Sequence, residues 1–182
     1  VLLQPTRMVP RKGIEDTLHL ARRLRDPAVK VVVTHPEPDE GKEYVGQLVA
    51  TADRLDVDFR VVPVGPGTEI DLGDAYTAAD LVTYPSRLEG FGNALLEAFY
   101  YRRPLLVNRY PVYEADIGPR GVAAIEMDGD LTDQIVAAVA NWLSDPGEWV
   151  AAVESNYELG RRYFSYGVAA KVLDAALADV GR

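Results

Sequence analysis

Short apolar runs alternate with amphipathic helical segments along most of this chain, and this alternation limits the folds open to it. Most of the apolar runs lack the alternating polar residues of a strand with one exposed face. They lie at Val1–Leu3, Lys30–Thr34, Phe59–Val64, Asp80–Tyr84, Leu105–Asn108 and Val122–Ile125. Continuous apolar strands are typical of a parallel sheet that is covered on both faces, so we expect helices on either side of it.

The segments between these runs carry apolar residues at helical spacing. Ile14, Leu18, Ala21 and Leu24, for example, share one face of a helix expected over 14–25. We expect further helices over 44–55, 74–79, 93–101, 131–143, 148–162 and 166–180, the last one capped by Ser165. The predicted fold class is therefore α/β, a doubly wound, Rossmann-like parallel sheet of about six strands with a C-terminal helical tail.

The length of 182 residues fits one domain. We place its core at about 1–144 and a pair of C-terminal helices at about 145–182, because the strand pattern stops there. The chain begins at Val1, inside an expected strand and without an initiator Met. We therefore expect it to be one half of a larger protein.

Composition excludes several classes of function. The net charge of −9 argues against nucleic acid and anionic membrane surfaces as partners. No apolar run reaches the roughly 20 residues that a membrane-spanning helix needs. The chain has no cysteine, which excludes disulfides and thiolate metal sites and fits a cytoplasmic protein. With only His19 and His35 available, we expect no multi-histidine metal centre.

Ligands of open α/β sheets bind beyond the carboxyl ends of the strands, so the segments after each strand are the candidates. The first of these, TRMVPRKG, places Arg7, Arg11 and Lys12 together without an acidic residue. Such a loop is either an anion site or a solvated surface loop. Cations before a helix N-terminus oppose the helix dipole unless an anion joins them, which favours the anion site.

The second candidate segment is SRLEGFGNALLEAF. Gly90 and Gly92 allow a tight turn close to a ligand, Asn93 is a suitable N-cap, and the N–H groups of the following helical turn favour negative charge. Glu89 stays on the loop while Glu97 lies about one turn inside the helix. Taken alone, the segment fits ordinary capping, with Glu97 complementing the dipole and Glu89 exposed.

The two segments together favour a ligand with both phosphates and hydroxyl groups. Cations and helix N–H groups suit phosphate, whereas carboxylates accept hydrogen bonds from vicinal hydroxyls. We therefore predict a nucleotide-sugar. No complete P-loop, dinucleotide fingerprint or nucleophile elbow occurs. His35 either lines the cleft or forms a turn, and we expect His19 to be partly packed in its helix.

Four segments are similar, in order, to those of one known family: PTRMVPRKGIEDTLHLA, AYTAADLVTYPSRLEGFGNALLEAF, RRPLLVNRYPVYEADI and FSYGVAAKVLD. Over nearly its whole length the chain resembles the C-terminal, donor-binding domain of family 4 glycosyltransferases, the retaining group with the two-domain GT-B architecture. The resemblance implies a donor-binding domain for a nucleoside-diphosphate sugar, with UDP or GDP as the nucleotide. The partner implied is an N-terminal acceptor domain of the same polypeptide, and any membrane contact would come from that domain.

The resemblance also implies roles for residues. Glu89 would contact sugar hydroxyls and Glu97 the ribose, while Arg7 and Lys12 would clamp the diphosphate and stabilise the departing nucleotide. Catalytic roles would thus fall to Arg7, Lys12 and Glu89, and the mechanism that the resemblance implies needs no metal and no cofactor. The remaining donor contacts would come from backbone at Gly90, Phe91, Gly92, Asn93 and Ala94, and the base would lie near Val64, Gly65 and Pro66.

Two departures from the family pattern stand out. His35 replaces a common glycine after the second strand, and Asn108-Arg109-Tyr110 replaces a loop of smaller residues. The bulkier loop either reaches an anionic acceptor or braces the interdomain cleft. The leading interpretation is a retaining hexosyltransferase whose donor domain is inactive alone. The alternatives are a non-catalytic nucleotide-sugar binding module and a GT-B-related epimerase.

Overall fold

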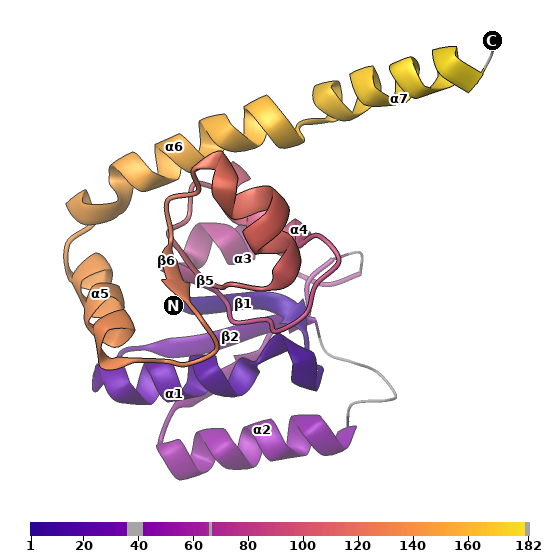
Figure 1. Ribbon diagram of the computed structural model, residues 1–182. Coiled ribbons are helices and arrows are strands. Elements are labelled where there is room, and N and C mark those ends of the chain that lie inside the picture. Colours follow the sequence, from indigo (N-terminus) through magenta and orange to yellow (C-terminus); the bar gives the residue numbers. More distant parts are fainter. Residues whose placement is uncertain (36–41, 66, 181–182) are drawn as a thin grey trace.

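A computed structural model describes residues 1–35, 42–65 and 67–180 (Figure 1). Within these residues one sheet contains β1 (Leu2–Arg7), β2 (Lys30–His35), β3 (Asp58–Val61), β4 (Leu81–Tyr84), β5 (Leu105–Asn108) and β6 (Ile125–Met127). The strand order is β3-β2-β1-β4-β5-β6, and neighbouring strands are parallel. The predicted doubly wound α/β fold is confirmed.

Helices cover both faces of the sheet (Figure 1). One face packs against α1 (Ile14–Leu24), α2 (Lys42–Leu55) and α5 (Asp133–Ser144), and the other against α3 (Leu72–Ala78), α4 (Asn93–Tyr100) and α6 (Gly147–Phe164). The last helix, α7 (Tyr166–Val180), follows α6. The sequence did not predict three short helical turns, η1 (Pro10–Lys12), η2 (Tyr113–Ile117) and η3 (Gly118–Arg120).

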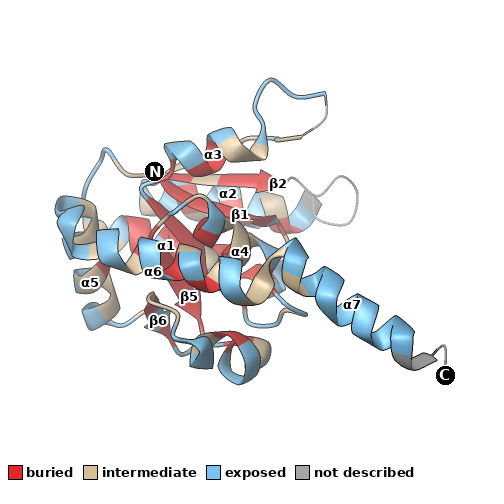
Figure 2. Ribbon diagram, turned by 90° about the horizontal axis from the view of Figure 1, so that it is seen from above, coloured by how far each residue is buried: buried red, intermediate tan, exposed pale blue. Residues whose placement is uncertain are grey.

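The strands contribute to a separate apolar core on each face of the sheet. In β1, Leu2 packs into the core beneath α1, α2 and α5, and its neighbour Leu3 packs into the core beneath α3 and α4. Leu106 and Leu105 of β5 divide in the same way. The buried strands lie between exposed helix surfaces in Figure 2. This two-sided burial is the reason that the strands read as continuous apolar runs.

Three strand predictions need correction. The first strand was expected over Val1–Leu3 but runs to Arg7, because Gln4 and Arg7 also pair with Val33 and His35 of β2, so Arg7 ends the strand. The last strand was expected over Val122–Ile125 but begins at Ile125, because Gly121 adopts a left-handed backbone (φ +95°) and the N–H of Ala123 donates to Asn156 Oδ1 of α6. This stretch is therefore held by α6 and not by β5. The third strand ends at Val61, three residues early, because Pro63 lacks the N–H that a strand would donate.

The capping predictions had different outcomes. The helix α4 begins at Asn93, the first residue of its predicted range, but its N-cap is Gly92, which has a left-handed backbone (φ +105°), and not Asn93. Ser165 stands at the predicted N-cap position of α7. Its backbone is extended, and its carbonyl accepts from the N–H groups of Val168 and Ala169.

The helix α7 extends away from the body of the molecule (Figures 1 and 2). None of its described side chains, residues 166–178, is buried, and Tyr166 is 94% exposed. Among the described residues, no helix is both long enough and apolar enough to cross a bilayer.

Candidate functional site

The direction of the strand order changes between β1 and β4. The chain builds β2 and β3 outward from one side of β1, then returns to place β4 on the other side. The helices that follow β1 and β4, α1 and α4, therefore lie on opposite faces of the sheet, and such a point commonly forms a ligand-binding crevice at the carboxyl ends of the strands. A pocket of about 430 Å³ opens there, lined by Pro5, Thr6, Arg7, Lys12, His35, Leu72, Tyr84, Glu89, Phe91, Gly92, Asn93, Ala94 and Glu97.

Most of the predicted site residues meet in this pocket. Among the exceptions, Gly90 and Arg11 stand next to lining residues in sequence, whereas Val64 and Gly65 do not line it. Val64 packs against the core under α3 and α4, and the N–H of Gly65 donates to the carbonyl of Ile70 at 3.3 Å. Pro66, the third residue expected near the base, lies outside the described residues.

Leu72 was not predicted from the sequence as a site residue, His35 was left with two interpretations, and His19 was wrongly expected to be partly packed. Leu72 lines the pocket as the first residue of α3, directly after its N-cap Asp71. That N-cap was the signal by which Leu72 could have been found. His35 ends β2 and lines the pocket, so the first of its two interpretations is correct. His19 is exposed on α1 and not partly packed.

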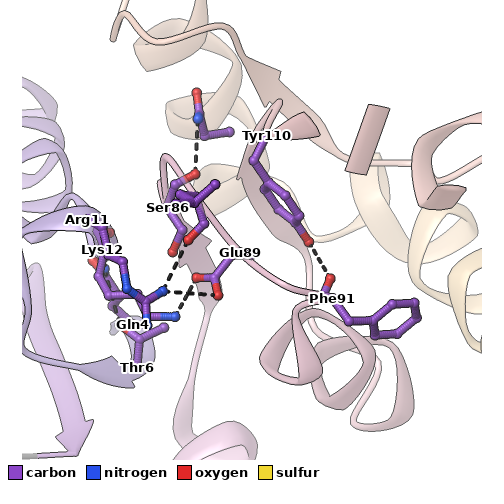
Figure 3. A network of polar contacts seen from close by, with 10 residues as sticks. Gln4, Thr6, Arg11, Lys12, Ser86, Glu89, Phe91 and Tyr110 are labelled. Atoms are coloured by element: carbon purple, nitrogen blue, oxygen red, sulfur yellow. Dashed lines mark hydrogen bonds and ion pairs between the residues drawn. The ribbon is translucent and has the colours of Figure 1, made fainter. Parts of the chain in front are cut away.

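An ion pair crosses from the β1 side of the pocket to the β4 side. Lys12 Nζ donates to Glu89 Oε1, and the two side chains are only 9% and 8% exposed. Arg11 supports the same carboxylate, with Nη1 3.6 Å from Glu89 Oε2, and donates to the carbonyl of Leu88 at 3.1 Å. Figure 3 shows Lys12 and Arg11 converging on Glu89. Glu89 is therefore not the exposed loop residue that ordinary capping would leave.

Glu89 is ionised despite its burial. Burial by itself would raise the pKa of its carboxyl group, but the hydrogen bond and the charge of Lys12 outweigh that effect and hold the pKa below the ordinary value of 4.5. An ionised carboxylate accepts hydrogen bonds and donates none. The oxygens of Glu89 are thus suited to receive hydroxyl groups of a ligand.

The backbone beneath Lys12 is held by a buried polar network. Gln4 Nε2 donates to the carbonyl of Lys12 at 2.8 Å, and Thr17 Oγ1 donates to Gln4 Oε1 at 2.7 Å. Thr17 Oγ1 also lies 3.0 Å from Thr83 Oγ1, so the network joins β1, α1 and β4. These polar residues inside apolar segments were the signal that the sequence offered for it.

Close backbone contacts join the two loops that form the pocket. Gly13, which precedes α1, has φ +63°, and a Cβ there would lie 2.8 Å from the carbonyl oxygen of Pro85. The N–H of Arg87 donates to the carbonyl of Arg11 at 2.9 Å. The loop after β1 therefore rests directly against the loop after β4.

Tyr110 supports the loop of residues 89–92, called here the glycine loop. This buried tyrosine donates its hydroxyl to the carbonyl of Phe91 at 2.8 Å (Figure 3). A Cβ at Gly92 would approach the same hydroxyl to 2.4 Å. The loop can pass this close to Tyr110 only because residue 92 is glycine.

The contacts of the loop Asn108-Arg109-Tyr110 are all with residues of this chain, among the residues that the structure describes. Asn108 is buried, donates to the carbonyl of Ser86 at 3.0 Å and accepts from the N–H of Gly129 at 2.8 Å. Arg109 is exposed, and its guanidinium lies 2.9 Å from Glu114. Asn108 and Tyr110 thus brace the loop after β4, a role that neither of the two sequence-based interpretations included.

The α4 side of the pocket combines helix N–H groups with a carboxylate. Leu95 already uses its N–H on the carbonyl of Gly92 at 3.0 Å. Within the described part of the chain, no hydrogen bond uses the N–H groups of Asn93 and Ala94, which line the pocket. Glu97 lines it one turn further on, and Tyr76 Oη donates to Glu97 Oε2 at 2.8 Å.

The pocket therefore offers cations and helix N–H groups for an anion, and two carboxylates for hydroxyl groups. The described residues contain no group of three or more His, Cys, Asp or Glu side chains that could hold a metal ion.

The family model described as "Glycosyl transferases group 1" matches residues 1–159. The chain is 30% identical over 195 residues to a mannosylglucosylglycerate synthase of Thermotoga maritima, covering 91% of this chain and 45% of that protein. The chain thus spans less than half the length of this curated relative.

Several solved structures share the fold, two of which are the following. The C-terminal domain of a glycosyl transferase group 1 family protein (LpcC) from Francisella tularensis aligns with a TM-score of 0.73 and 17% identity, covering 90% of this chain and 86% of that one. Anabaena Alr3699/HepE in complex with UDP and glucose aligns with a TM-score of 0.79 and 17% identity, covering 97% of this chain and 48% of that one.

Proposed function

The chain belongs to the glycosyl transferases group 1 family, and from this premise we propose that it is the donor-binding domain of a glycosyltransferase. It binds a nucleoside-diphosphate sugar in the pocket between the loops after β1 and β4. With an N-terminal acceptor domain of the same polypeptide, it transfers a hexose to an acceptor with retention of configuration. The observation that carries this proposal is the division of the pocket into a cationic side and a side with carboxylates and helix N–H groups.

The diphosphate binds between Lys12, Arg7 and the start of α4. The ammonium of Lys12 has three N–H donors, of which Glu89 occupies one, so the others remain for phosphate oxygens. The N–H groups of Asn93 and Ala94 face the same ligand. When the bond from the sugar to the diphosphate breaks, these groups stabilise the negative charge that grows on the departing phosphate.

The sugar and the ribose bind at the carboxylates. Glu89 is ionised and accepts from sugar hydroxyls, while Glu97 on α4 accepts from the hydroxyls of the ribose. The scheme uses no metal and no further cofactor. The solved Anabaena complex contains UDP and glucose, which supports a nucleotide-sugar ligand for this chain as well.

Several finer features are part of the same proposal. The nucleotide is UDP or GDP, its base binds near Val64 and Gly65, and the protein acts in the cytoplasm, in line with its cysteine-free composition. We place the donor-binding unit over the whole of residues 1–182. The chain alone is inactive, because transfer needs a cleft that closes between two domains.

Two other functions fit the fold: a nucleotide-sugar binding module without transferase activity, and an epimerase that changes the nucleotide-sugar itself. Arg7, Lys12, Glu89 and Glu97 all line one pocket, which favours the transferase over a degenerate binding module. An epimerase would convert the nucleotide-sugar without an acceptor, and analysis of the recovered nucleotide-sugar distinguishes it.

Calorimetry on the 182-residue chain tests the proposal. We expect binding of UDP or GDP and of the matching nucleotide-sugar. Lys12→Ala should weaken binding of the diphosphate about tenfold or more, because a charge-assisted hydrogen bond is lost, and should change nucleoside binding much less.

Lys30→Ala is the matched control, because Lys30 also pairs with an acidic side chain, Asp58, but lies at the other end of its strand and outside the pocket. It should leave nucleotide affinity unchanged. A folded protein that binds no nucleoside diphosphate would contradict the proposed function, and equal losses for diphosphate and nucleoside in Lys12→Ala would contradict the role of Lys12.

A further inference from the structure

Tyr76 places a polar group deep in the apolar core beneath α3. The residue is 0% exposed, and its ring stacks on that of Tyr101 with centroids 5.0 Å apart and planes at 12°. Phenylalanine would fill the same volume and make the same ring contact. Burying a hydroxyl group costs free energy unless it is hydrogen-bonded, so the hydroxyl of Tyr76 needs an acceptor.

The hydroxyl of Tyr76 has two acceptors, both on α4. Its oxygen lies 2.8 Å from Glu97 Oε2 and 3.0 Å from the carbonyl oxygen of Ala94. The shorter contact is to the charged acceptor, and hydrogen bonds to ionised groups are the stronger kind. Burial, followed by the charge of Glu97, raises the pKa of Tyr76 far above its usual range, so the hydroxyl stays a donor.

This bond leaves one oxygen of Glu97 for the pocket. Glu97 lines the pocket, and within the described residues its Oε1 has no hydrogen-bond partner. A glutamate side chain has several rotatable bonds, and a ligand that must immobilise them binds less tightly. With Oε2 held by Tyr76, the carboxylate is already fixed before a ligand arrives.

We propose that Tyr76 is the positioning residue that aims Glu97 at the nucleotide ribose, and that it thereby sets the preference of the pocket for ribonucleotides over nucleotides without ribose hydroxyls. The inference rests on the proposed function, because it places a nucleotide in the pocket with its ribose at Glu97. Tyr76 itself does not line the pocket, so it acts only through Glu97.

The test compares Tyr76→Phe with the unchanged protein, using calorimetry with a nucleoside diphosphate and with its 2′,3′-dideoxy analogue. The substitution keeps the ring and its stacking and removes only the donor. We expect affinity for the ribonucleotide to fall about 3- to 10-fold, the range for loss of one hydrogen bond, and affinity for the dideoxy analogue to change less than about twofold. The preference for the ribonucleotide should therefore shrink.

Tyr113→Phe is the matched control. Tyr113 is also buried and donates its hydroxyl to a carboxylate, Glu126 Oε1, at 2.5 Å, but neither residue lines the pocket. This variant should leave both affinities unchanged. In a double-mutant cycle, Tyr76→Phe combined with Glu97→Gln should lose little more ribose preference than Glu97→Gln alone, because both changes remove the same contact.

The outcomes distinguish a failure of the proposed function from a failure of the positioning role of Tyr76. If the unchanged protein binds no nucleoside diphosphate, the proposed function fails. If it binds, and Glu97→Gln lowers the ribose preference while Tyr76→Phe does not, the positioning role alone fails. An equal loss for both ligands in Tyr76→Phe would also overturn that role, since it would show a general structural defect.

Discussion

Position 92 requires glycine for two separate reasons. Its backbone has φ +105°, a conformation that residues with a side chain rarely adopt. A Cβ would also lie 2.4 Å from the hydroxyl of Tyr110, which holds the glycine loop through Phe91. Gly90 in the same loop has neither restriction: its φ is not positive, and a Cβ there would meet no atom within 4 Å.

Gly92 and Gly90 therefore allow a direct comparison. Gly92→Ala should destabilise the protein by about 1–3 kcal/mol from backbone strain, with a further loss from displacing Tyr110. It should also weaken binding of a nucleoside diphosphate, because the start of α4 moves. Urea unfolding and calorimetry measure the two effects. Gly90→Ala should change neither by much, and comparable losses in both variants would contradict this account of the loop.

Glu89 makes the stability of the fold depend on pH. Its pKa in the folded state lies below 4.5, the ordinary value of an unfolded glutamate, so the ionised form stabilises the fold. The contribution is complete above about pH 4.5 and is lost as pH falls through the folded-state pKa. Lys12→Ala removes the hydrogen bond from Lys12 and leaves burial to raise the pKa, so acid unfolding should begin at a higher pH.

Circular dichroism during acid titration checks this shift. The double variant Lys12→Ala with Glu89→Gln should lose the added acid sensitivity, because no carboxyl group remains to titrate at that position. An unchanged acid midpoint in Lys12→Ala would show that the ion pair does not stabilise the folded state.

At the scale of elements, α3 depends on its first turn. It is a short helix, and Asp71 and Asp74 form a reciprocal capping box, with Asp71 Oδ1 2.7 Å from the N–H of Asp74 and Asp74 Oδ2 3.1 Å from the N–H of Asp71. The helix carries Leu72 at the pocket and Tyr76 against Glu97. Fraying of α3 would therefore disturb the pocket.

Asp71→Ala should cost about 1 kcal/mol of stability, the usual effect of losing an N-cap acceptor. Asp71→Asn keeps an acceptor oxygen and should cost much less. Urea unfolding of the two variants measures the difference. Equal stability of both with the unchanged protein would mean that packing alone holds α3.

The elements that sequence reasoning predicted well are those with strong periodicity. The helix predicted from Ile14, Leu18, Ala21 and Leu24 ends within one residue of α1. The last strand was misplaced because its position depends on a contact between Ala123 and Asn156 of α6, which has no local signal. The turn η1 was missed because three residues show no period.

The same distinction applies to the site. Strand order could bring Arg7 and Lys12 close to Glu89 and Glu97, since the carboxyl ends of parallel strands meet at one edge. The sequence could not show that Lys12 and Glu89 form a buried pair, because that depends on the contact of the loops at Gly13 and Pro85. The hydrogen bond from Tyr76 to Glu97 was not predicted either, because it depends on how α3 and α4 lie in the folded chain.

At the scale of the whole molecule, α7 contributes little to the folded core. It lacks buried side chains in its described part and exposes Val172, Leu173 and Leu177, which are 58–65% accessible. Removal of residues 166–182 should therefore change the stability of the remainder by no more than about 0.5 kcal/mol, as expected for surface changes.

Nucleotide binding should also survive that truncation, because no residue of α7 lines the candidate donor pocket. Thermal unfolding and calorimetry on the shortened chain measure both properties. Truncation at residue 146 is the contrasting variant, since it also removes α6 with its buried Val153, Asn156 and Leu159, and it should unfold the protein. A large loss on removing α7 alone would show that this helix packs on the body.

The pairing of β1 with β4 also determines when a ligand-competent state can arise during folding. Leu2 pairs with Leu81, and Lys12 reaches Glu89 across 77 positions of sequence. Closing a loop of that length lowers chain entropy before any contact compensates, so such long-range pairing slows folding. The pocket is lined by residues from the loops after both β1 and β4, so a partly folded chain in which only one of these loops is in place has no pocket. The ligand therefore selects the finished structure, and it should slow unfolding while leaving the folding rate unchanged.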